Sequence, residues 1–181
     1  MSQELLRPRR KASKLLGSCY ELAEVLCSAM VAVAVLFAFV VRFANVVGFS
    51  MEPTLRDRQT LVLSPMVNGL KHGDIVVVSE EGTRIPPPNG PEVIVKRVVG
   101  LPGDVIDIDF DACVVYRNGV ALVEDYIAEP TRSSGDVEFP VTVSDGAVFL
   151  LGDNRNRSID SRESCVGLVD QRYILGRVMF K

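Results

Sequence analysis

The chain of 181 residues contains a single histidine, His72, and this scarcity excludes several kinds of catalytic site. A Ser–His–Asp triad or a Cys–His dyad would have to use His72. The residue stands in the sequence Lys-His-Gly-Asp, which is typical of an exposed turn, so we expect a solvated loop residue. Sequence alone neither supports nor excludes the paired carboxylates of a glycoside hydrolase.

Cysteine is also scarce. The chain has four, none of them in a Cys-x-x-Cys pair: Cys19, Cys27, Cys113 and Cys165. A zinc site draws several Cys and His ligands at short spacings, so we expect no metal site, and no cofactor. Cys113 and Cys165 could form a disulfide in an oxidising compartment, but the interpretation that we favour is two small buried hydrophobic side chains.

The main part of the chain has little net positive charge to offer, because its acidic residues outnumber its basic ones. The net charge is −3, and residues 1–16 hold five basic residues against one glutamate, so the remainder is more acidic than the chain as a whole. A nucleic-acid-binding protein needs a cationic surface on its folded domain. Nucleic acid is therefore not an expected partner.

The longest apolar run extends from Val25 to Val41, with Ser28 as its one polar residue. As a helix it would be about 26 Å long, slightly less than the ~30 Å hydrocarbon core of a bilayer, and apolar residues on both sides extend it. We predict an uncleaved transmembrane anchor over residues 22–47. A cleavable signal peptide would have a shorter apolar core, and a core helix of a soluble protein would not explain the flanking charge.

The basic residues before this run predict that the N-terminus lies in the cytoplasm. Residues 1–21 would then be a cytoplasmic basic segment, and residues 48–181 would form an extracytoplasmic domain. The chain would cross the cell membrane once, with the lipid bilayer as a partner.

Residues 48–181 alternate short runs rich in Val, Ile and Leu with Gly, Pro, Asn and Asp, which predicts a mainly β domain of coiled antiparallel sheets. Asn118-Gly119 is a strong hairpin signal. Residues 80–91 and 129–135 are predicted loops. The predicted strands are Thr60–Leu63, Ile75–Ser79, Glu92–Val99, Val105–Ile108, Cys113–Tyr116, Val120–Val123, Ala147–Leu151 and Ile174–Phe180.

Lys96 is the most unusual residue of these strands, because it interrupts the apolar run over residues 93–99. It shares one strand face with Ile94 and Val98. An apolar setting disfavours the charged ammonium form of lysine and so lowers its pKa. A pKa lowered by about two units corresponds to destabilising the ammonium by roughly 3 kcal/mol, and it would allow Lys96 to act as a general base near neutral pH. A snorkelling lysine, or one half of an ion pair, is the alternative that composition alone favours.

A lysine base needs a nucleophile, and Ser50 is the candidate. It stands between Gly48 and Pro53, directly after the predicted anchor. The segment is not the G-x-S-x-G elbow of hydrolases, and no serine is followed three residues later by lysine, as in penicillin-binding enzymes. Residues 152–162 form a third polar segment, whose hydroxyls could hold an amine; by itself it would be a surface loop.

Four segments together, in order, resemble the bacterial type I signal peptidases, also called leader peptidases. They are residues 50–55, 73–76, 96–104 and 152–162. The resemblance extends from residue 20 to residue 181 and is specific because all four segments follow a predicted anchor. It implies a signal-peptidase-like catalytic core and a membrane-bound serine endopeptidase that removes signal peptides from exported pre-proteins.

The resemblance also implies roles for individual residues. Ser50 would be the nucleophile, with its backbone N–H as an oxyanion donor, and Lys96 the general base. Ser158 would hold the Lys96 amine. The remaining residues would support the site: Asp160 and Arg162, with Arg97, would form the ion-pair support behind it, and Gly152 and Asp153 would shape the adjoining loop.

The implied substrate is a pre-protein with small residues at −1 and −3, bound in extended form by strand addition. The short chain with Gly48 resembles the Gram-positive type of the family, and Glu163-Ser164-Cys165 is unusual for it.

Two alternative functions remain. A self-cleaving repressor-type Ser–Lys protease would carry a DNA-binding module, and residues 1–47 show no helix-turn-helix pattern. A non-catalytic anchored β domain would keep Ser50 and Lys96 apart.

Overall fold

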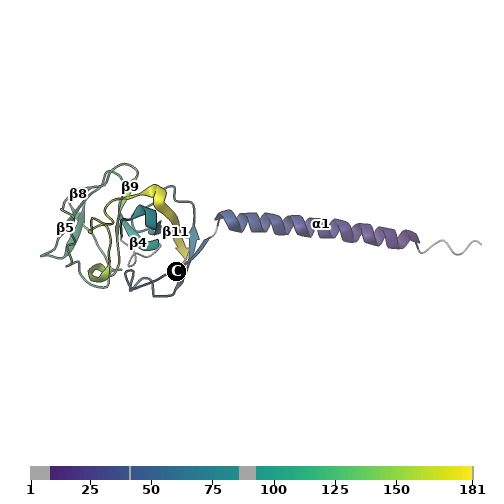
Figure 1. Cartoon of the computed structure of the whole chain (residues 1–181), viewed down its shortest axis with the longest axis horizontal. Coiled ribbons are helices and arrows are strands. Elements are labelled where there is room, and N and C mark those ends of the chain that lie inside the picture. Colours follow the sequence, from purple (N-terminus) through teal and green to yellow (C-terminus); the bar gives the residue numbers. More distant parts are fainter. Residues whose placement is uncertain (1–8, 41, 86–92, 181) are drawn as a thin grey trace, which may run out of the picture. The chain divides into compact units, whose positions relative to one another are not determined.

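The computed structural model describes residues 9–40, 42–85 and 93–180, which divide into two units, one before residue 41 and one after it. The first unit contains the helix α1 (Arg9–Val40) and the second contains the strands (Figure 1). Three predicted features lie partly outside the described residues: the basic segment before residue 9, the loop from residue 86 to 91, and Glu92 at the start of a strand.

Helix α1 has 32 residues, and its segment Gly17–Val35 is long and apolar enough to cross a membrane. The side chains of that segment are exposed, which suits a helix whose apolar surface faces lipid. The helix begins at Arg9, well before residue 22, where the predicted anchor begins.

Strand β1 (Arg42–Asn45) occupies residues that we predicted as the end of the anchor. It pairs antiparallel with β2 (Thr60–Ser64), with Phe43 opposite Val62, and Thr60 Oγ1 donates a hydrogen bond to Asn45 Oδ1 (3.0 Å). Short apolar runs do not distinguish a helix end from a strand, because the partner that stabilises the strand lies elsewhere in the sequence.

The described strands form two antiparallel sheets, so the prediction of a mainly β fold is confirmed. The large sheet has the order β1-β2-β11-β3-β4-β9-β10 and the small sheet the order β7-β6-β5-β8. The other strands of the large sheet are β3 (Ile75–Ser79), β4 (Val93–Gly100), β9 (Ala147–Leu151), β10 (Val169–Asp170) and β11 (Ile174–Phe180). The small sheet contains β5 (Val105–Asp109), β6 (Val114–Arg117), β7 (Val120–Ala121) and β8 (Val141–Thr142).

Most predicted strands are confirmed, and β3, β9 and β11 match them residue for residue. The Asn-Gly hairpin is also confirmed, because β6 pairs with β7 and both turn residues have positive φ, 54° at Asn118 and 77° at Gly119. Strands β8 and β10 have two residues each, and no sequence pattern predicts them. Single 3₁₀ turns are η1 (Glu80–Gly82), η2 (Arg155–Arg157) and η3 (Gln171–Tyr173).

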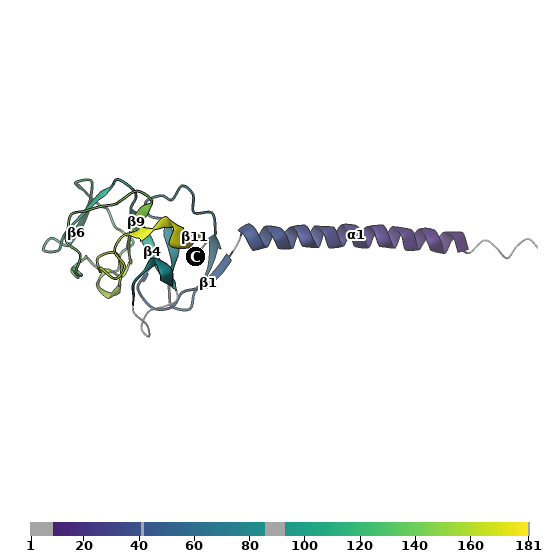
Figure 2. The same ribbon diagram turned by 45° about the horizontal axis from the view of Figure 1, so that its top comes forward.

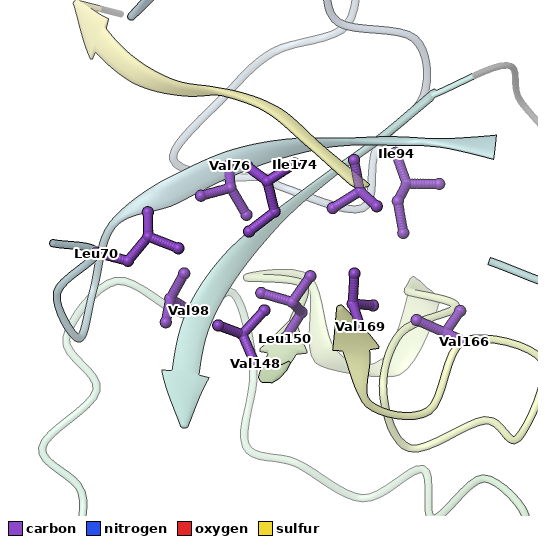
Figure 3. Packing of buried hydrophobic residues seen from close by; sticks show 10 residues of the cluster. Leu70, Val76, Ile94, Val98, Val148, Leu150, Val166, Val169 and Ile174 are labelled. Carbon is purple, nitrogen blue, oxygen red and sulfur yellow. The ribbon is translucent and has the colours of Figure 1, made fainter. Parts of the chain in front are cut away.

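Strand β4 lies inside the large sheet, between β3 and β9, and Figure 2 shows it beside β9. Figure 3 shows Val76 of β3, Ile94 of β4 and Ile174 of β11 facing side chains from β9 and β10 across an apolar core. Every residue from Ile94 to Gly100 is buried. A charged side chain on this strand is therefore removed from water.

Candidate active site

Ser50 and Lys96 stand 46 positions apart in the sequence, and the fold brings them together. Lys96 Nζ lies 2.8 Å from Ser50 Oγ. Strand β4 positions the lysine. The turn after β1 carries the serine, and Asn154 fixes this turn by donating from its backbone N to Ser50 O (3.0 Å) and from Nδ2 to Phe49 O (3.1 Å).

The Lys96 side chain is only 3% exposed, and within the described residues no carboxylate forms an ion pair with it. Its Nζ also donates to Val95 O (3.1 Å). Burial lowers the pKa of Lys96 to about 8, although the charges of Asp160 and Asp153 raise it. Lys96 is thus neither a snorkelling lysine nor half of an ion pair, and its neutral form is accessible near neutral pH.

Arg97, the next residue, is paired instead. Its Nε and Nη2 donate to the two oxygens of Asp153 (2.8 and 2.5 Å), and its guanidinium lies 4.0 Å from the Tyr126 ring centroid. Burial lowers the pKa of Arg97, but the hydrogen bond and charge of Asp153 outweigh this and raise it. Arg97 is thus part of an ion pair, but with Asp153 and not with Asp160, the acidic residue with which it was grouped in the prediction.

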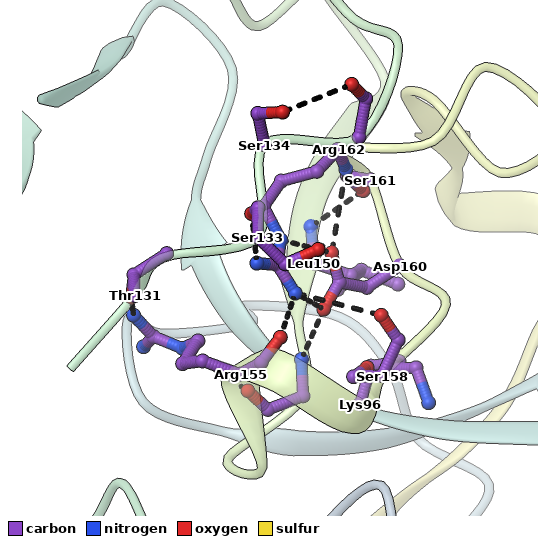
Figure 4. Close-up of polar contacts among 12 residues, drawn as sticks. Lys96, Thr131, Ser133, Ser134, Leu150, Arg155, Ser158, Asp160, Ser161 and Arg162 are labelled. Atoms are coloured by element: carbon purple, nitrogen blue, oxygen red, sulfur yellow. Dashed lines mark hydrogen bonds and ion pairs between the residues drawn. The ribbon is translucent and has the colours of Figure 1, made fainter. Parts of the chain in front are cut away.

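Asp160 and Arg162 form the predicted ion pair, in a fully buried position. Arg162 Nε donates to Asp160 Oδ1 (2.8 Å), and the backbone N of Gly152 donates to Asp160 Oδ2 (2.9 Å). Figure 4 shows this carboxylate at the centre of a network that joins both ends of the loop over residues 152–162. The pair fixes the shape of the loop.

The structure contains a third buried ion pair, which the sequence analysis did not predict. Arg155 is fully buried, forms an ion pair with Glu124, and donates to Thr131 Oγ1 (2.8 Å) and Gly152 O (3.0 Å). It ties the 152–162 loop to the segment that follows the small sheet's hairpin. Arg155 belongs to the polar segment 152–162 that the sequence analysis singled out, but nothing in the sequence identifies Glu124 as its partner.

Gly152 lies where any side chain would collide with the site. A Cβ there would overlap the Ser158 hydroxyl and lie 2.6 Å from Ser50 O. Ser158 Oγ is buried without a hydrogen-bond partner among the described residues. The predicted bond between Ser158 and Lys96 is therefore not formed, because the Lys96 amine binds Ser50 Oγ and Val95 O instead.

A groove of about 390 Å³ opens beside the two groups. Apart from Ser50, Lys96 and Asn45, its lining is apolar: Val46, Val47, Met51, Val93, Ile94 and Val95. Arg97–Gly100 of β4 pair with β9, but β9 ends at Leu151, opposite Arg97. The first half of β4 thus has β3 on one side and no described strand on the other.

The remaining candidates form no hydrogen bond with Ser50 or Lys96 among the described residues. His72 is in an exposed turn, as predicted, and its Nε2 lies 2.7 Å from Asp104 Oδ2. All four cysteines are free thiols, so Cys113 and Cys165 do not form a disulfide. In the part of the chain that the structure describes, no group of three or more His, Cys, Asp or Glu could hold a metal ion.

A hydroxyl at hydrogen-bond distance from a buried amine of lowered pKa, beside an apolar groove, can perform nucleophilic chemistry without histidine. Comparison with known proteins gives the family. The family model described as "Signal peptidase, peptidase S26" matches residues 19–181. The chain therefore belongs to the signal peptidase family, peptidase S26, and is an enzyme of this serine protease family.

Two relatives that are similar in sequence agree with this assignment. Signal peptidase I of Bacillus licheniformis is 32% identical over 180 residues, which cover 94% of this chain and 91% of that protein. Signal peptidase I T of Bacillus subtilis (strain 168) is 34% identical over 166 residues, 83% of this chain and 80% of that one. A crystal structure of a signal peptidase I from Enterococcus faecalis V583 aligns with 62% of this chain and 99% of its own, at 31% identity and a TM-score of 0.46.

Proposed function

We propose that this chain is a membrane-anchored endopeptidase that removes signal peptides from exported pre-proteins, with Ser50 as nucleophile and Lys96 as general base. The observation that carries the proposal is the 2.8 Å contact between Ser50 Oγ and the buried amine of Lys96. A protonated Lys96 donates to Ser50 Oγ. Once deprotonated, the amine accepts the Ser50 O–H proton across the same contact.

Acylation begins when neutral Lys96 takes this proton and Ser50 Oγ attacks the scissile carbonyl carbon. The tetrahedral intermediate collapses by breaking the C–N bond, and the Lys96 ammonium gives its proton to the leaving amine. A water molecule then attacks the acyl ester while Lys96 accepts its proton. Collapse of the second intermediate releases the carboxylate of the signal peptide and returns the proton to Ser50 Oγ.

The developing oxyanion needs a donor close to Ser50. The backbone N–H of Ser50 has no partner among the described residues, so it is available for this role. Gly48 has no hydroxyl to add, and its own N–H donates to Asp57 Oδ1 (2.9 Å).

The apolar groove suits the residues before the scissile bond. An extended peptide can pair with the free edge of β4 at residues 93–96, which would supply main-chain hydrogen bonds beside Ser50. The aliphatic side chains in the groove would then favour small apolar side chains at −1 and −3 of the substrate.

Helix α1 would be the membrane anchor, with the basic N-terminal segment in the cytoplasm and the catalytic domain outside. Ser50 follows the last residue of α1 by only ten positions in the sequence. A nucleophile so close in sequence to the anchor suits a substrate whose own apolar segment lies in the bilayer.

The test is processing of a pre-protein by the detergent-solubilised full chain. The wild type should cleave it, and Ser50→Ala and Lys96→Met should not. Ser144→Ala and Lys71→Met are matched controls at exposed positions and should retain activity. Equal processing by the wild type and both site variants would show that Ser50 and Lys96 are not the catalytic dyad. No processing by the wild type would favour a binding domain, and self-cleavage alone would favour a repressor-type protease.

A further inference from the structure

A second hollow adjoins the turn that carries Ser50, and the roles proposed above do not use it. Its volume is about 470 Å³, and its lining includes Glu52, Arg56, Glu129, Asn154 and Arg157. Ser50 and Met51 line the apolar groove, whereas Glu52 and Pro53 line this hollow. The same turn is therefore a wall of both.

The backbone around the hollow is fixed. Asn154 N donates to Ser50 O (3.0 Å), and Ala128 N donates to Asp153 O (3.0 Å). Asn156 Nδ2 donates to Glu129 Oε2 (3.0 Å). The three segments that line the hollow are thus tied to the nucleophile's turn and to one another, so the hollow is a preformed feature of the site.

Three of the four charged side chains of this hollow are free of partners among the described residues, in contrast to the buried arginines behind the site. Within the described residues, the side chains of Glu52, Arg56 and Arg157 have no hydrogen bond or ion pair. Arg155, two positions before Arg157, is fully paired. Unpaired charges of both signs in a concave, preformed hollow are available to polar groups of a ligand.

We propose that this polar hollow binds the first residues of the mature protein, on the leaving-group side of the scissile bond, and selects charged side chains there. The inference rests on the proposed function. An extended substrate held in the apolar groove must continue past Ser50, and three further residues span about 10 Å. The polar hollow lies beyond Ser50 along the same turn. An apolar substrate side chain in the hollow would exclude water from the free charges of the lining and offer them no hydrogen-bond partner, which is unfavourable.

Arg157 gives the sharpest test because its charge can be reversed without touching the dyad. Two peptides would be identical through the scissile bond and carry either Glu or Lys at +2 and +3. The measured quantity is the ratio of their kcat/KM values with the detergent-solubilised full chain. Because both values come from one preparation, a folding defect cancels in the ratio.

Arg157→Glu should shift the ratio toward the Lys peptide by on the order of tenfold. Arg132→Glu, an exposed arginine outside the hollow, should leave it unchanged. An unchanged ratio in Arg157→Glu, or an equal shift in Arg132→Glu, would overturn the inference while leaving the protease intact. If the wild type cleaves neither peptide, the proposed function fails together with this inference.

Discussion

Lys96 and the buried arginines behind it have opposite environments. Four basic side chains are buried in the described part of the chain, and three of them bind a carboxylate: Arg97 with Asp153, Arg155 with Glu124, and Arg162 with Asp160. Among the described residues, Lys96, the fourth, has only the Ser50 hydroxyl and a backbone carbonyl as hydrogen-bond partners.

The difference shows how one domain uses buried charge in two ways. A buried cation with a carboxylate stays charged and holds its loop in place. A buried amine without one loses solvation that nothing replaces, and lowering its pKa from 10.5 to about 8 costs roughly 3 kcal/mol in the charged form. In the proposed mechanism, that cost is what allows the amine to act as a base near neutral pH.

The largest expected effect is on activity, when the unpaired amine is removed. Lys96→Met should lower kcat/KM by on the order of 10³- to 10⁴-fold, because Ser50 loses its proton acceptor. Steady-state cleavage of a peptide substrate measures it. A loss smaller than tenfold would show that another group deprotonates Ser50.

Removing a carboxylate from a paired cation should instead affect stability. Asp160→Asn would leave the Arg162 guanidinium buried without its counter-ion and should reduce the free energy of unfolding by about 3–5 kcal/mol. Asp170→Asn is the matched control, since Asp170 and Arg172 form a pair with the same spacing on the surface. Denaturant unfolding of both variants checks the contrast, and equal losses would contradict it.

Lys96→Met should also change stability, with a dependence on pH. Below pH 8 the folded and unfolded states both hold the Lys96 proton, and the folded state carries the full penalty, so the variant should be more stable than the wild type by roughly 3 kcal/mol. Between pH 8 and 10.5 the unfolded wild type binds more protons than the folded one, so wild-type stability should rise and the advantage should shrink. Unfolding at pH 7 and 10 measures this, and a constant difference would count against it.

The smallest effect is expected at Ser158. Its buried hydroxyl has no hydrogen bond among the described residues, so Ser158→Ala removes an unpartnered polar group and should not lower the free energy of unfolding. Activity should fall far less than in Lys96→Met. A loss above a hundredfold would show that Ser158 contacts the amine during the reaction, as the family resemblance predicts.

The sequence predicts those features that depend on neighbouring residues. The strand around Lys96 has aliphatic residues on both of its faces, and the Asn118-Gly119 turn has its own backbone signal. The partners of the buried arginines do not follow from sequence, because Asp153 and Glu124 lie 56 and 31 positions from Arg97 and Arg155 and resemble any other acidic residue before the chain folds. Strand β1 was missed for the same reason, since its pairing with β2 decides its conformation.

The central claim is tested most directly by the pKa of the Lys96 amine in the active protein. The pH dependence of kcat/KM from pH 6 to 10.5, together with the rate at which an amine reagent modifies Lys96, reports this pKa. We predict that kcat/KM rises about tenfold per pH unit and levels off at about pH 8, with modification following the same curve. If both curves continue to rise to the ordinary pKa of lysine, Lys96 is charged in the working range of the enzyme and the proposed mechanism is wrong.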